Sequence, residues 1–270
     1  MYGKETRLRF AKETVWGQAP ATGWVGVSPL AAAVSLSGRA DTQRYVNAAA
    51  PGAVYAVATF EAAAAEGDIV ALSDAALKRD GDGQIASYTI QAADAGGARE
   101  VRGAVVRRFK MKSGIARPAL EFLFEFVGKA TAPAAAFEAS GGGTHFTFPG
   151  AEVRIDTTAV AAKEFSINLN NNIFVGPTDD DNDPAFFSAG RQELTGYIIA
   201  GDDRRDLVDG DDHPFEITLP GDAGDAVIAA GAVFFTWCRE IRSAAAGALQ
   251  VLYFEGAAGG VTSGLSVALS

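Results

Sequence analysis

The acidic run at 179–183, Asp-Asp-Asp-Asn-Asp, is the stretch of the sequence whose residue types and spacing come nearest to a ligand site. Asp179, Asp181 and Asp183 have the spacing with which an EF-hand calcium loop begins. That loop also needs a glycine at its sixth position and a bidentate glutamate at its twelfth, where this chain has Pro184 and Gly190. We therefore interpret the run as a solvated acidic loop tip and predict neither a metal site nor a cofactor.

Two histidines and one cysteine are the other side chains that could act as a base or a nucleophile. His145 lies among glycines and His213 among aspartates, and the sequence places no nucleophile beside either of them. A Ser-His-Asp arrangement can assemble from distant positions, so a hydrolase built on one of these histidines stays open as an alternative. The sequence contains no nucleophile elbow, phosphate-binding loop, zinc-binding helix or dinucleotide fingerprint. Cys238 ends an apolar run, which is typical of a buried, unreactive thiol. We predict that the protein is not an enzyme.

The composition bounds the class of protein. With 270 residues, of which 48% are hydrophobic, the chain can bury a substantial core and is not disordered throughout. The net charge of −10 disfavours a protein that coats duplex DNA, whereas a chain that stays near DNA without sticking to it would look acidic. A single cysteine excludes an intrachain disulfide and a cysteine-based metal cluster. The first ten residues lack an apolar core and no run of about 18 apolar residues occurs, so we expect no signal peptide, no membrane span and synthesis in a cytoplasm.

The segment 100–128 predicts two long antiparallel strands joined by a turn at 113–118, and the rest of the chain is organised around it. In each strand, apolar residues recur at every second position over much of the length and define a face for the core. The residues expected on that face are Val101, Val105, Phe109 and Met111 in the first strand and Leu120, Phe122, Phe124 and Phe126 in the second.

The opposite face of this hairpin is charged. Opposite charges on facing positions add only about 0.2–1 kcal/mol per pair, but they disfavour a slip of one residue in the register. Arg107 interrupts the apolar face, which suggests that something other than this chain covers part of it. The charged residues expected to face one another are Arg108, Lys110 and Lys112 on the first strand and Glu121 and Glu125 on the second.

Strand candidates separated by turn signals recur along the whole chain, which is typical of a sandwich or barrel and not of βαβ units. The Ala-, Pro- and Gly-rich stretch 131–144 is expected to be a linker between an N-terminal half, 1–130, and a C-terminal half, 145–270. The predicted fold is mainly β: an antiparallel β-sandwich or barrel with one or two short flanking helices. Strands are expected at 33–39, 53–60, 87–91, 151–156, 164–170, 192–200, 215–219, 249–255 and 261–269, and helical stretches at 61–66, at 68–78 and near 222–230.

Two loops carry aromatic residues that could anchor a partner. Trp16 and Trp24 lie among Gly and Pro in an extended segment, where they either fold back on their own core or insert into a neighbouring copy. The loop 176–190 is unusually long, which is generally a sign of function. It carries Phe186 and Phe187 beside the acidic run and ends at Arg191, which opens a strand.

Four segments of the sequence form a recognisable series: Lys-Glu-Thr-Val-Trp-Gly-Gln-Ala-Pro at 12–20, Phe-Val-Gly-Lys at 126–129, Glu-Phe-Ser-Ile-Asn-Leu-Asn-Asn-Asn at 164–172 and Gly-Arg-Gln-Glu-Leu-Thr-Gly-Tyr at 190–197. The last two give an apolar strand that ends in Asn, followed by a long loop, Gly-Arg and a strand with Thr-Gly. Together these segments resemble the tail tube proteins, also called major tail proteins, of long-tailed bacteriophages with non-contractile tails, and the last two segments resemble them most.

The resemblance implies a structural virion protein whose protomers join side by side into rings, and rings that stack into a tube through which DNA is ejected without specific binding. It implies the tail terminator, tape measure and baseplate proteins as partners. It also implies that the arm 1–26 and the loop 176–190 contact neighbouring subunits and that the lumen is acidic. The candidate contact residues are Trp16, Trp24, Phe186, Phe187 and Arg191, and the candidate lumen residues are Asp179, Asp181 and Asp183.

The length of the chain leaves two ring sizes open. A single tube domain is usually shorter, so either the fold is duplicated and forms trimeric rings with a six-fold appearance, or one domain carries large insertions and forms hexamers. The sequence shows no convincing repeat between 1–130 and 145–270, which favours the hexamer. Unpaired sheet edges support ring formation on physical grounds, because a heterologous contact closes into a ring when its rotation closes. The alternative function is a phage adsorption, baseplate or decoration protein with a carbohydrate-binding β-sandwich.

Overall fold

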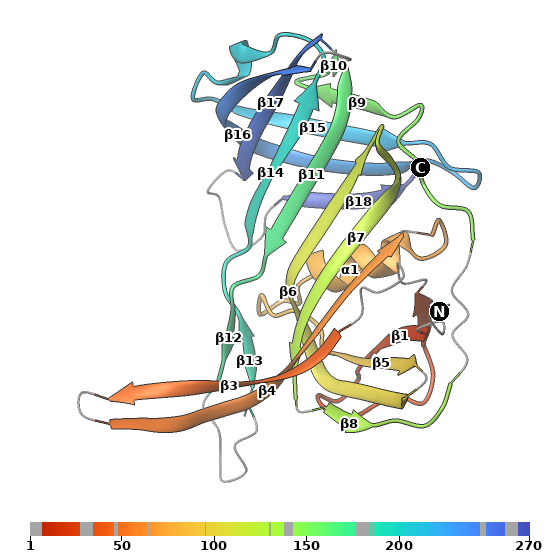
Figure 1. Cartoon of the computed structure of the whole chain (residues 1–270), viewed down its shortest axis with the longest axis vertical. Coiled ribbons are helices and arrows are strands. Elements are labelled where there is room, and N and C mark those ends of the chain that lie inside the picture. Colours follow the sequence, from red (N-terminus) through yellow and green to blue (C-terminus); the bar gives the residue numbers. More distant parts are fainter. Residues whose placement is uncertain are drawn as a thin grey trace.

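A computed structural model gives the fold (Figure 1) and describes residues 7–27, 35–45, 48–63, 65–94, 96–129, 131–137, 143–176, 184, 186–243, 247–256 and 264–270, with the backbone alone at 38–45, 48–54, 243 and 247. Strands dominate, and most of the pairing is antiparallel, as the sequence predicts. Within these ranges no helix is long and apolar enough to cross a membrane.

The elements fall into two series along the chain (Figure 1). The first comprises β1 (Arg7–Lys12), β2 (Val25–Val27), β3 (Ser35–Tyr45), β4 (Ala48–Ala63), α1 (Ile69–Leu77), β5 (Tyr88–Asp94), β6 (Gly97–Gly114), β7 (Arg117–Gly128) and β8 (Thr131–Pro133). The second comprises β9 (Glu152–Ile155), β10 (Thr158–Val160), β11 (Ala162–Asn170), β12 (Ile173–Val175), β13 (Phe187–Ala189), β14 (Glu193–Ala200), the 3-10 turn η1 (Arg205–Leu207), β15 (Asp212–Leu219), β16 (Ala226–Ser243), β17 (Gly247–Gly256) and β18 (Leu265–Leu269).

Eight strands lie side by side in one antiparallel sheet, in the order β3-β4-β7-β6-β11-β14-β17-β16. A second layer continues from the first part of β6 through β5, β1 and β2, and from the first part of β16 through β15, β9 and β10. One hydrophobic cluster fills the space that these layers enclose and includes residues of α1 and of both series. The ladder between β6 and β11 joins the two series.

The strand pairings of the first series recur in the second. The pairs β1–β2, β1–β5, β5–β6, β6–β7, β4–β7, β3–β4 and β6–β8 correspond in order to β9–β10, β9–β15, β15–β16, β16–β17, β14–β17, β11–β14 and β16–β18. The helix α1 stands between β4 and β5 where η1 stands between β14 and β15. The fold is therefore a structural repeat, although the sequence shows no convincing one.

The correspondence extends to single residues. β6 and β16 each have 18 residues, and a shift of 129 carries the bounds of β6 onto those of β16. The bulge that leaves Arg107 without a partner on β7 has its equivalent in the bulge at Thr236 opposite β17. The second bulge of each strand also matches, because the pairs Tyr88↔Ala104 and Ile90↔Val101 correspond to His213↔Val233 and Phe215↔Ala230.

The two bulges of β6 change which of its residues face the core. Each bulge adds one residue and thereby moves every later side chain to the other face. The prediction that Val105 lies on the core face is therefore wrong: Val106 belongs to the main core, and Val105 packs in a small cluster on the opposite face with Tyr55 and Val127. The four predicted core residues of β7 are confirmed, and all four are buried: Leu120, Phe122, Phe124 and Phe126.

The bulge also accounts for Arg107. Its guanidinium pairs with Glu125, so it lies on the charged face and does not interrupt the core as predicted. Lys112 pairs with Glu121 as expected, with 2.9 Å between Nζ and Oε2. Arg108 stands opposite Glu125 in the ladder, but the carboxylate bonds its neighbour instead.

Other expected elements differ from the structure in ways that have physical reasons. The Ala-rich stretch 61–66 is not a helix, because residues up to Ala63 continue β4 and pair with β7. The stretch 222–230 is not a helix either, since β16 begins at Ala226. Residues 7–12, read as part of an arm, form β1 because Leu8 and Phe10 alternate into the core. The helix expected at 68–78 is confirmed as α1.

We predict that Phe124→Ala lowers the free energy of unfolding by about 3–5 kcal/mol, because Phe124 is fully buried and its ring packs against those of Phe60, Phe109 and Phe126. Urea denaturation measures the loss. The matched control is Leu123→Ala, one residue away on the half-buried outer face, which should cost less than half as much. Equal losses at the two positions would contradict the assignment of the core face.

Candidate assembly surfaces

The bulge of β6 at Gly103 is held by the N-terminal loop. Gly103 has φ of +60°, and a Cβ there would stand 2.7 Å from Nε1 of Trp16, so only glycine fits. The buried carboxylate of Glu13 accepts hydrogen bonds from the backbone N–H of Gly103 and Gly17 and from the hydroxyls of Ser87 and Thr89. Part of the segment that carries the first resemblance motif therefore ties β1, β5 and β6 together.

Trp16 and Trp24 are both half-buried and pack on their own chain. The indole of Trp16 donates to the carbonyl of Gly103, lies under the ammonium of Lys129 and meets Phe187 edge to face. Trp24 stacks on the guanidinium of Arg9, 4.3 Å from its ring centroid. Of the two possibilities that the sequence leaves open for these residues, the structure shows contacts within the chain.

The bulge of β6 at Arg107 is held by Asn171, which is fully buried. Its backbone N–H donates to the carbonyl of Arg107, and its amide group donates to the carbonyls of Val106 and Ala76. The amide oxygen accepts from Gln192 at 3.0 Å. Asn171 thus joins β6, the end of α1 and the segment before β14, so two parts of the strongest resemblance motif meet here.

The long loop expected at 176–190 is in part a short hairpin, because β12 pairs with β13. Phe186 is exposed and packs only loosely on exposed Phe174, with 6.4 Å between ring centroids, while Phe187 is half-buried. Arg191 is exposed, and its carbonyl accepts from the amide of Asn172. The candidate lumen residues Asp179, Asp181 and Asp183 lie outside the described residues.

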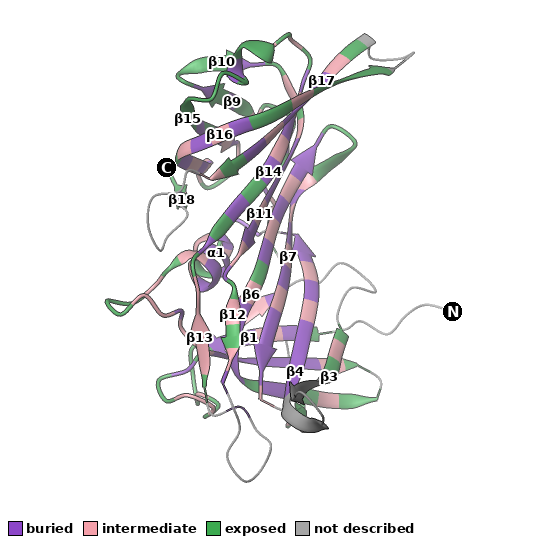
Figure 2. Ribbon diagram, turned by 90° about the vertical axis from the view of Figure 1, so that its left-hand side faces the viewer, coloured by how far each residue is buried: buried purple, intermediate pink, exposed green. Residues whose placement is uncertain are grey.

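Among the described strands, none pairs with one edge of β16 at its far end. On one side β18 and then β17 accompany β16 along most of its length, but on the other side β15 stops at Phe234. Residues 236–242 are mostly exposed on both faces of the β16–β17 hairpin, which Figure 2 shows projecting from the body. A two-stranded ribbon in water is marginally stable, so a ribbon that projects in this way is suited to pair with another chain.

An aromatic row crosses the outer face of this hairpin. Trp237, which is 55% exposed, stacks on Tyr253 with 5.2 Å between ring centroids, and Tyr253 packs against Tyr197. The three residues face one another on β16, β17 and β14. The hydroxyl of Tyr197 donates to the carboxylate of Glu164, and burial followed by this hydrogen bond raises the pKa of Tyr197 to about 12. The row is an exposed apolar surface beside an open edge, and sequence periodicity alone does not reveal it.

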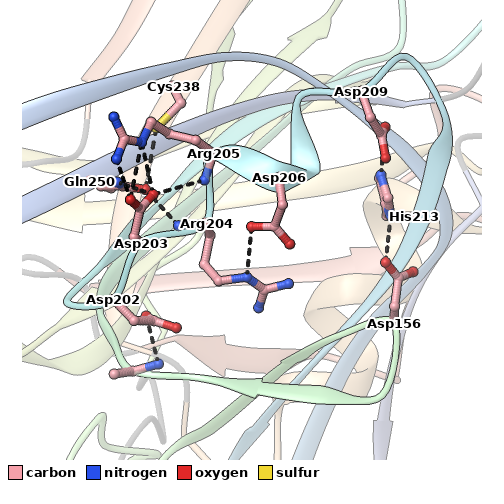
Figure 3. A network of polar contacts seen from close by, with 11 residues as sticks. Asp156, Asp202, Asp203, Arg204, Arg205, Asp206, Asp209, His213, Cys238 and Gln250 are labelled. Carbon is pink, nitrogen blue, oxygen red and sulfur yellow. Dashed lines mark hydrogen bonds and ion pairs between the residues drawn. The ribbon is translucent and has the colours of Figure 1, made fainter.

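A polar network closes the core at the root of the same hairpin (Figure 3). The amide of Gln250, buried on β17, accepts from the backbone N–H of Arg204 at 2.8 Å and donates to Asp203 at 2.7 Å. Asp203 is also bound by the guanidinium of Arg205, and the bonds from Arg205 and then Gln250 lower the pKa of Asp203. The network connects the loop after β14 to β17 and thereby stabilises the end of the β16–β17 hairpin that lies next to the body of the protein.

His213 lies between two carboxylates in the same region (Figure 3). Its Nδ1 is 2.5 Å from Asp156 and its Nε2 is 3.1 Å from Asp209, and the ring is buried against Phe235. Burial alone would lower the pKa of His213, but the hydrogen bonds and charges of Asp156 and Asp209 outweigh it and raise the pKa. The arrangement favours the protonated imidazolium, which links the turn at Asp156 to the turn at Asp209.

The residues considered for catalysis take part in other contacts within the described chain. His145 bridges to Ala65 in an isolated strand contact, and His213 is occupied by its two carboxylates. Burial is the main cause that raises the pKa of Cys238, so its thiol is a poor nucleophile. Among the residues described, no group of His, Cys, Asp and Glu could hold a metal ion.

Comparison with known proteins gives one family. The model of a family described as phage tail tube protein matches residues 3–262, which is nearly the whole chain. No curated protein matches the chain. The match spans both structural repeats and all four resemblance segments, so it agrees with the resemblance seen in the sequence.

We predict that Asn171→Ala lowers the free energy of unfolding by about 2–4 kcal/mol, because it removes the hydrogen bonds that the buried carbonyls of Val106 and Ala76 accept from its amide and leaves Ala76 only the longer bond of 3.4 Å from Gln192. Thermal melting or urea denaturation measures the effect. Asn168→Ala is the matched control, since Asn168 is half-buried on the outer face of the same strand and should cost less than about 1 kcal/mol. If the two variants were equally stable, Asn171 would not have the central role assigned to it.

A second prediction concerns pH. Because the folded pKa of His213 is raised above an unfolded value of about 6.5, its stabilising effect is fully present below that pH and is lost as the pH rises through the folded pKa. The melting temperature of the wild type should therefore fall, relative to that of His213→Asn, as the pH rises above about 6.5. His145→Asn is the control and should keep the wild-type slope. Parallel curves for the wild type and His213→Asn would refute the effect.

Proposed function

Because the chain belongs to the phage tail tube protein family, we propose that it is a structural subunit that joins copies of itself into rings, and that stacked rings form the tube through which viral DNA leaves. In this proposal the protein has no catalytic role, is made in the host cytoplasm and becomes part of the virion. Its other partners are the tail terminator, tape measure and baseplate proteins.

The observation that carries the proposal is that the eight-stranded sheet ends on two open edges. Among the described strands, β3 pairs only with β4, and β16 has no partner beyond Phe234 on one of its edges. Open edges invite association, and here the two edges are different surfaces of one chain. A contact between unlike surfaces closes into a ring when its rotation closes and does not stop at a dimer.

The outer face of the sheet is suited to line a bore. The other face carries the core and the second layer of β1, β5, β9 and β15, so the outer face, apart from the part that the β12–β13 hairpin covers, would look toward an empty axis. Across β6 and β7 this face pairs Lys112 with Glu121 and Arg107 with Glu125. Cations that are already neutralised attract DNA phosphates only weakly, which suits DNA that slides without binding.

The remaining predicted residues have roles in this proposal. Phe186 and Arg191 are exposed at the β12–β13 hairpin and would contact the next ring. Trp16, Trp24 and Phe187 are half-buried in their own chain and would add only the surface they leave exposed. Asp179, Asp181 and Asp183 would face the lumen as a negative collar.

Electron microscopy of the purified protein tests the proposal. We expect rings or tubes, because two unlike open edges allow each copy to bind two others. A protein that stays monomeric at high concentration in every salt tried, and binds oligosaccharides instead, would contradict the proposal and favour the alternative function of an adsorption or decoration protein.

A shortened hairpin provides the matched variant. Residues 241–249 are replaced by Asn-Gly, so that Glu240 and Gln250, which face each other on β16 and β17, are joined by a two-residue turn. Gln250 and its bond to Asp203 are kept. The variant should melt within a few degrees of the wild type and form no rings.

A further inference from the structure

A polar cavity opens on the outer face of the sheet, beside β12. It encloses about 550 Å³, and residues of β3, β4, β6, β7, β11 and β12 line it. Only Val57 and Ile173 are apolar among these residues, and the others are charged, amides or a serine. A concave site with convergent polar groups is the usual form of a ligand site. Because this lining is mostly polar, the cavity suits a charged ligand.

The bulge of β6 brings two consecutive arginines to this cavity. Neighbours on a regular strand point to opposite faces, whereas a bulge sets two residues opposite one and re-aims their side chains. Arg107 and Arg108 both line the cavity, and Glu125 on β7 is the residue that stands opposite this bulge. Two guanidinium groups therefore share one carboxylate, and the lining carries excess positive charge.

The guanidinium of Arg107 is held in place. Its Nε donates to Glu125, and a second hydrogen bond joins it to buried Tyr55. Burial alone would lower the pKa of Arg107, but the hydrogen bonds and charges of Glu125 and Tyr55 outweigh it and raise the pKa. A guanidinium has five N–H donors in one rigid plane, so these two partners leave donors for another acceptor.

The guanidinium of Arg108 is exposed and has no such partner. Within the part of the chain that the structure describes, no hydrogen bond or ion pair engages it, because Glu125 is bound by Arg107. Across the cavity wall, Arg108 stands opposite Asn170 in the ladder between β6 and β11. Arg108 is therefore a cation at a cavity wall that is available to a ligand.

Two amides add further donors. The amide nitrogen of Asn170 donates one N–H to the side chain of Asn172, and that of Asn172 donates one to the carbonyl of Arg191. Each amide nitrogen has two N–H groups, so each keeps one for a ligand. These hydrogen bonds also hold the two amides at the rim of the cavity.

We propose that this cavity binds a phosphate group, with the guanidinium groups of Arg107 and Arg108 as its main ligands and the amides of Asn170 and Asn172 as additional donors. The phosphate is inorganic phosphate or belongs to a phosphate ester. The inference goes beyond the proposed function, which assigns this face no ligand. In the proposed tube the cavity would stand in the wall of the bore.

The donors favour a phosphate over a carboxylate. A carboxylate has two oxygens in one plane, and the site already contains one, that of Glu125, on Arg107. A phosphate presents its oxygens at the corners of a tetrahedron, so two guanidinium groups can bind it from different sides. Phosphate contacts carry no sequence information and allow a protein to slide and hop along DNA, so such a site is compatible with DNA that passes through.

Isothermal titration calorimetry of the full chain with inorganic phosphate, at fixed ionic strength, tests the site. Arg108→Gln removes the unpaired guanidinium, and the exposed position should leave the melting temperature unchanged. Lys110→Gln is the matched control, because it removes the same charge from the same strand but does not line the cavity. Arg108→Lys keeps the charge and loses the planar fork of donors.

We expect Arg108→Gln to weaken phosphate binding about tenfold or more, since hydrogen bonds to charged groups are lost. Arg108→Lys should also weaken it, whereas Lys110→Gln should change it less than about twofold. Equal weakening by Arg108→Gln and Lys110→Gln would overturn the inference, because it would indicate only a general positive field. Acetate that binds as tightly as phosphate, or a wild type without saturable phosphate binding, would overturn it too.

Competition with a short DNA duplex identifies the source of the phosphate. A duplex that displaces phosphate from the wild type, and whose binding loses about one unit of salt dependence in Arg108→Gln, makes the DNA backbone the ligand. A duplex that does not compete makes free phosphate or a small phosphate ester the ligand, and both results support the site. The titration uses unassembled protein, so a failure to form rings would overturn the proposed function and leave this inference standing.

Discussion

The backbone N–H and C=O groups along a strand edge need partners, and this requirement organises the whole molecule. β6 meets it on both edges, with β5 and then β11 on one side and β8 and then β7 on the other. β16 has the same length and the equivalent first partners, β15 and β18, but no described strand follows β15 on its edge. Both edges of β6 are paired within the chain, whereas one edge of its counterpart β16 is paired only in part. The chain therefore completes its own core but leaves strand edges open at the two ends of the sheet.

The pairing of β6 on both edges depends on buried polar side chains at its two bulges. A bulge leaves backbone groups without their ladder partners, and here Glu13 and Asn171 supply replacements. Both side chains are buried and have several partners each, which makes them costly to replace. A third, Glu66, accepts from the backbone N–H groups of Asp222 and Ala223 and ties the end of β4 to the turn before β16. These contacts explain why short motifs that lie far apart in the sequence can together identify the family.

The sequence predicted the fold class, the central hairpin and the core face of β7, because alternation with period two survives wherever a strand is regular. It assigned the wrong valine of β6 to the core face, because no residue pattern indicates a bulge and because Val105 and Val106 are chemically identical. The sequence did not single out Glu13 or Asn171, because burial of a polar group depends on partners that are distant in the sequence. The repeat stayed hidden because strand order is set by burial and pairing and not by identity: Phe109 and Met111 face the core where their equivalents are Cys238 and Glu240.

The central claim is that on assembly the open edge of β16 pairs with a strand of another copy, as the equivalent edge of β6 pairs with β11 within the chain. Amide hydrogen exchange of the monomer and of the assembled protein measures this most directly, because an amide in a ladder exchanges slowly and a free one does not. The claim predicts that the edge amides of 237–243 exchange fast in the monomer and become as protected on assembly as those of 108–114, which stay protected in both. Assembled particles in which 237–243 exchange as fast as in the monomer would contradict it.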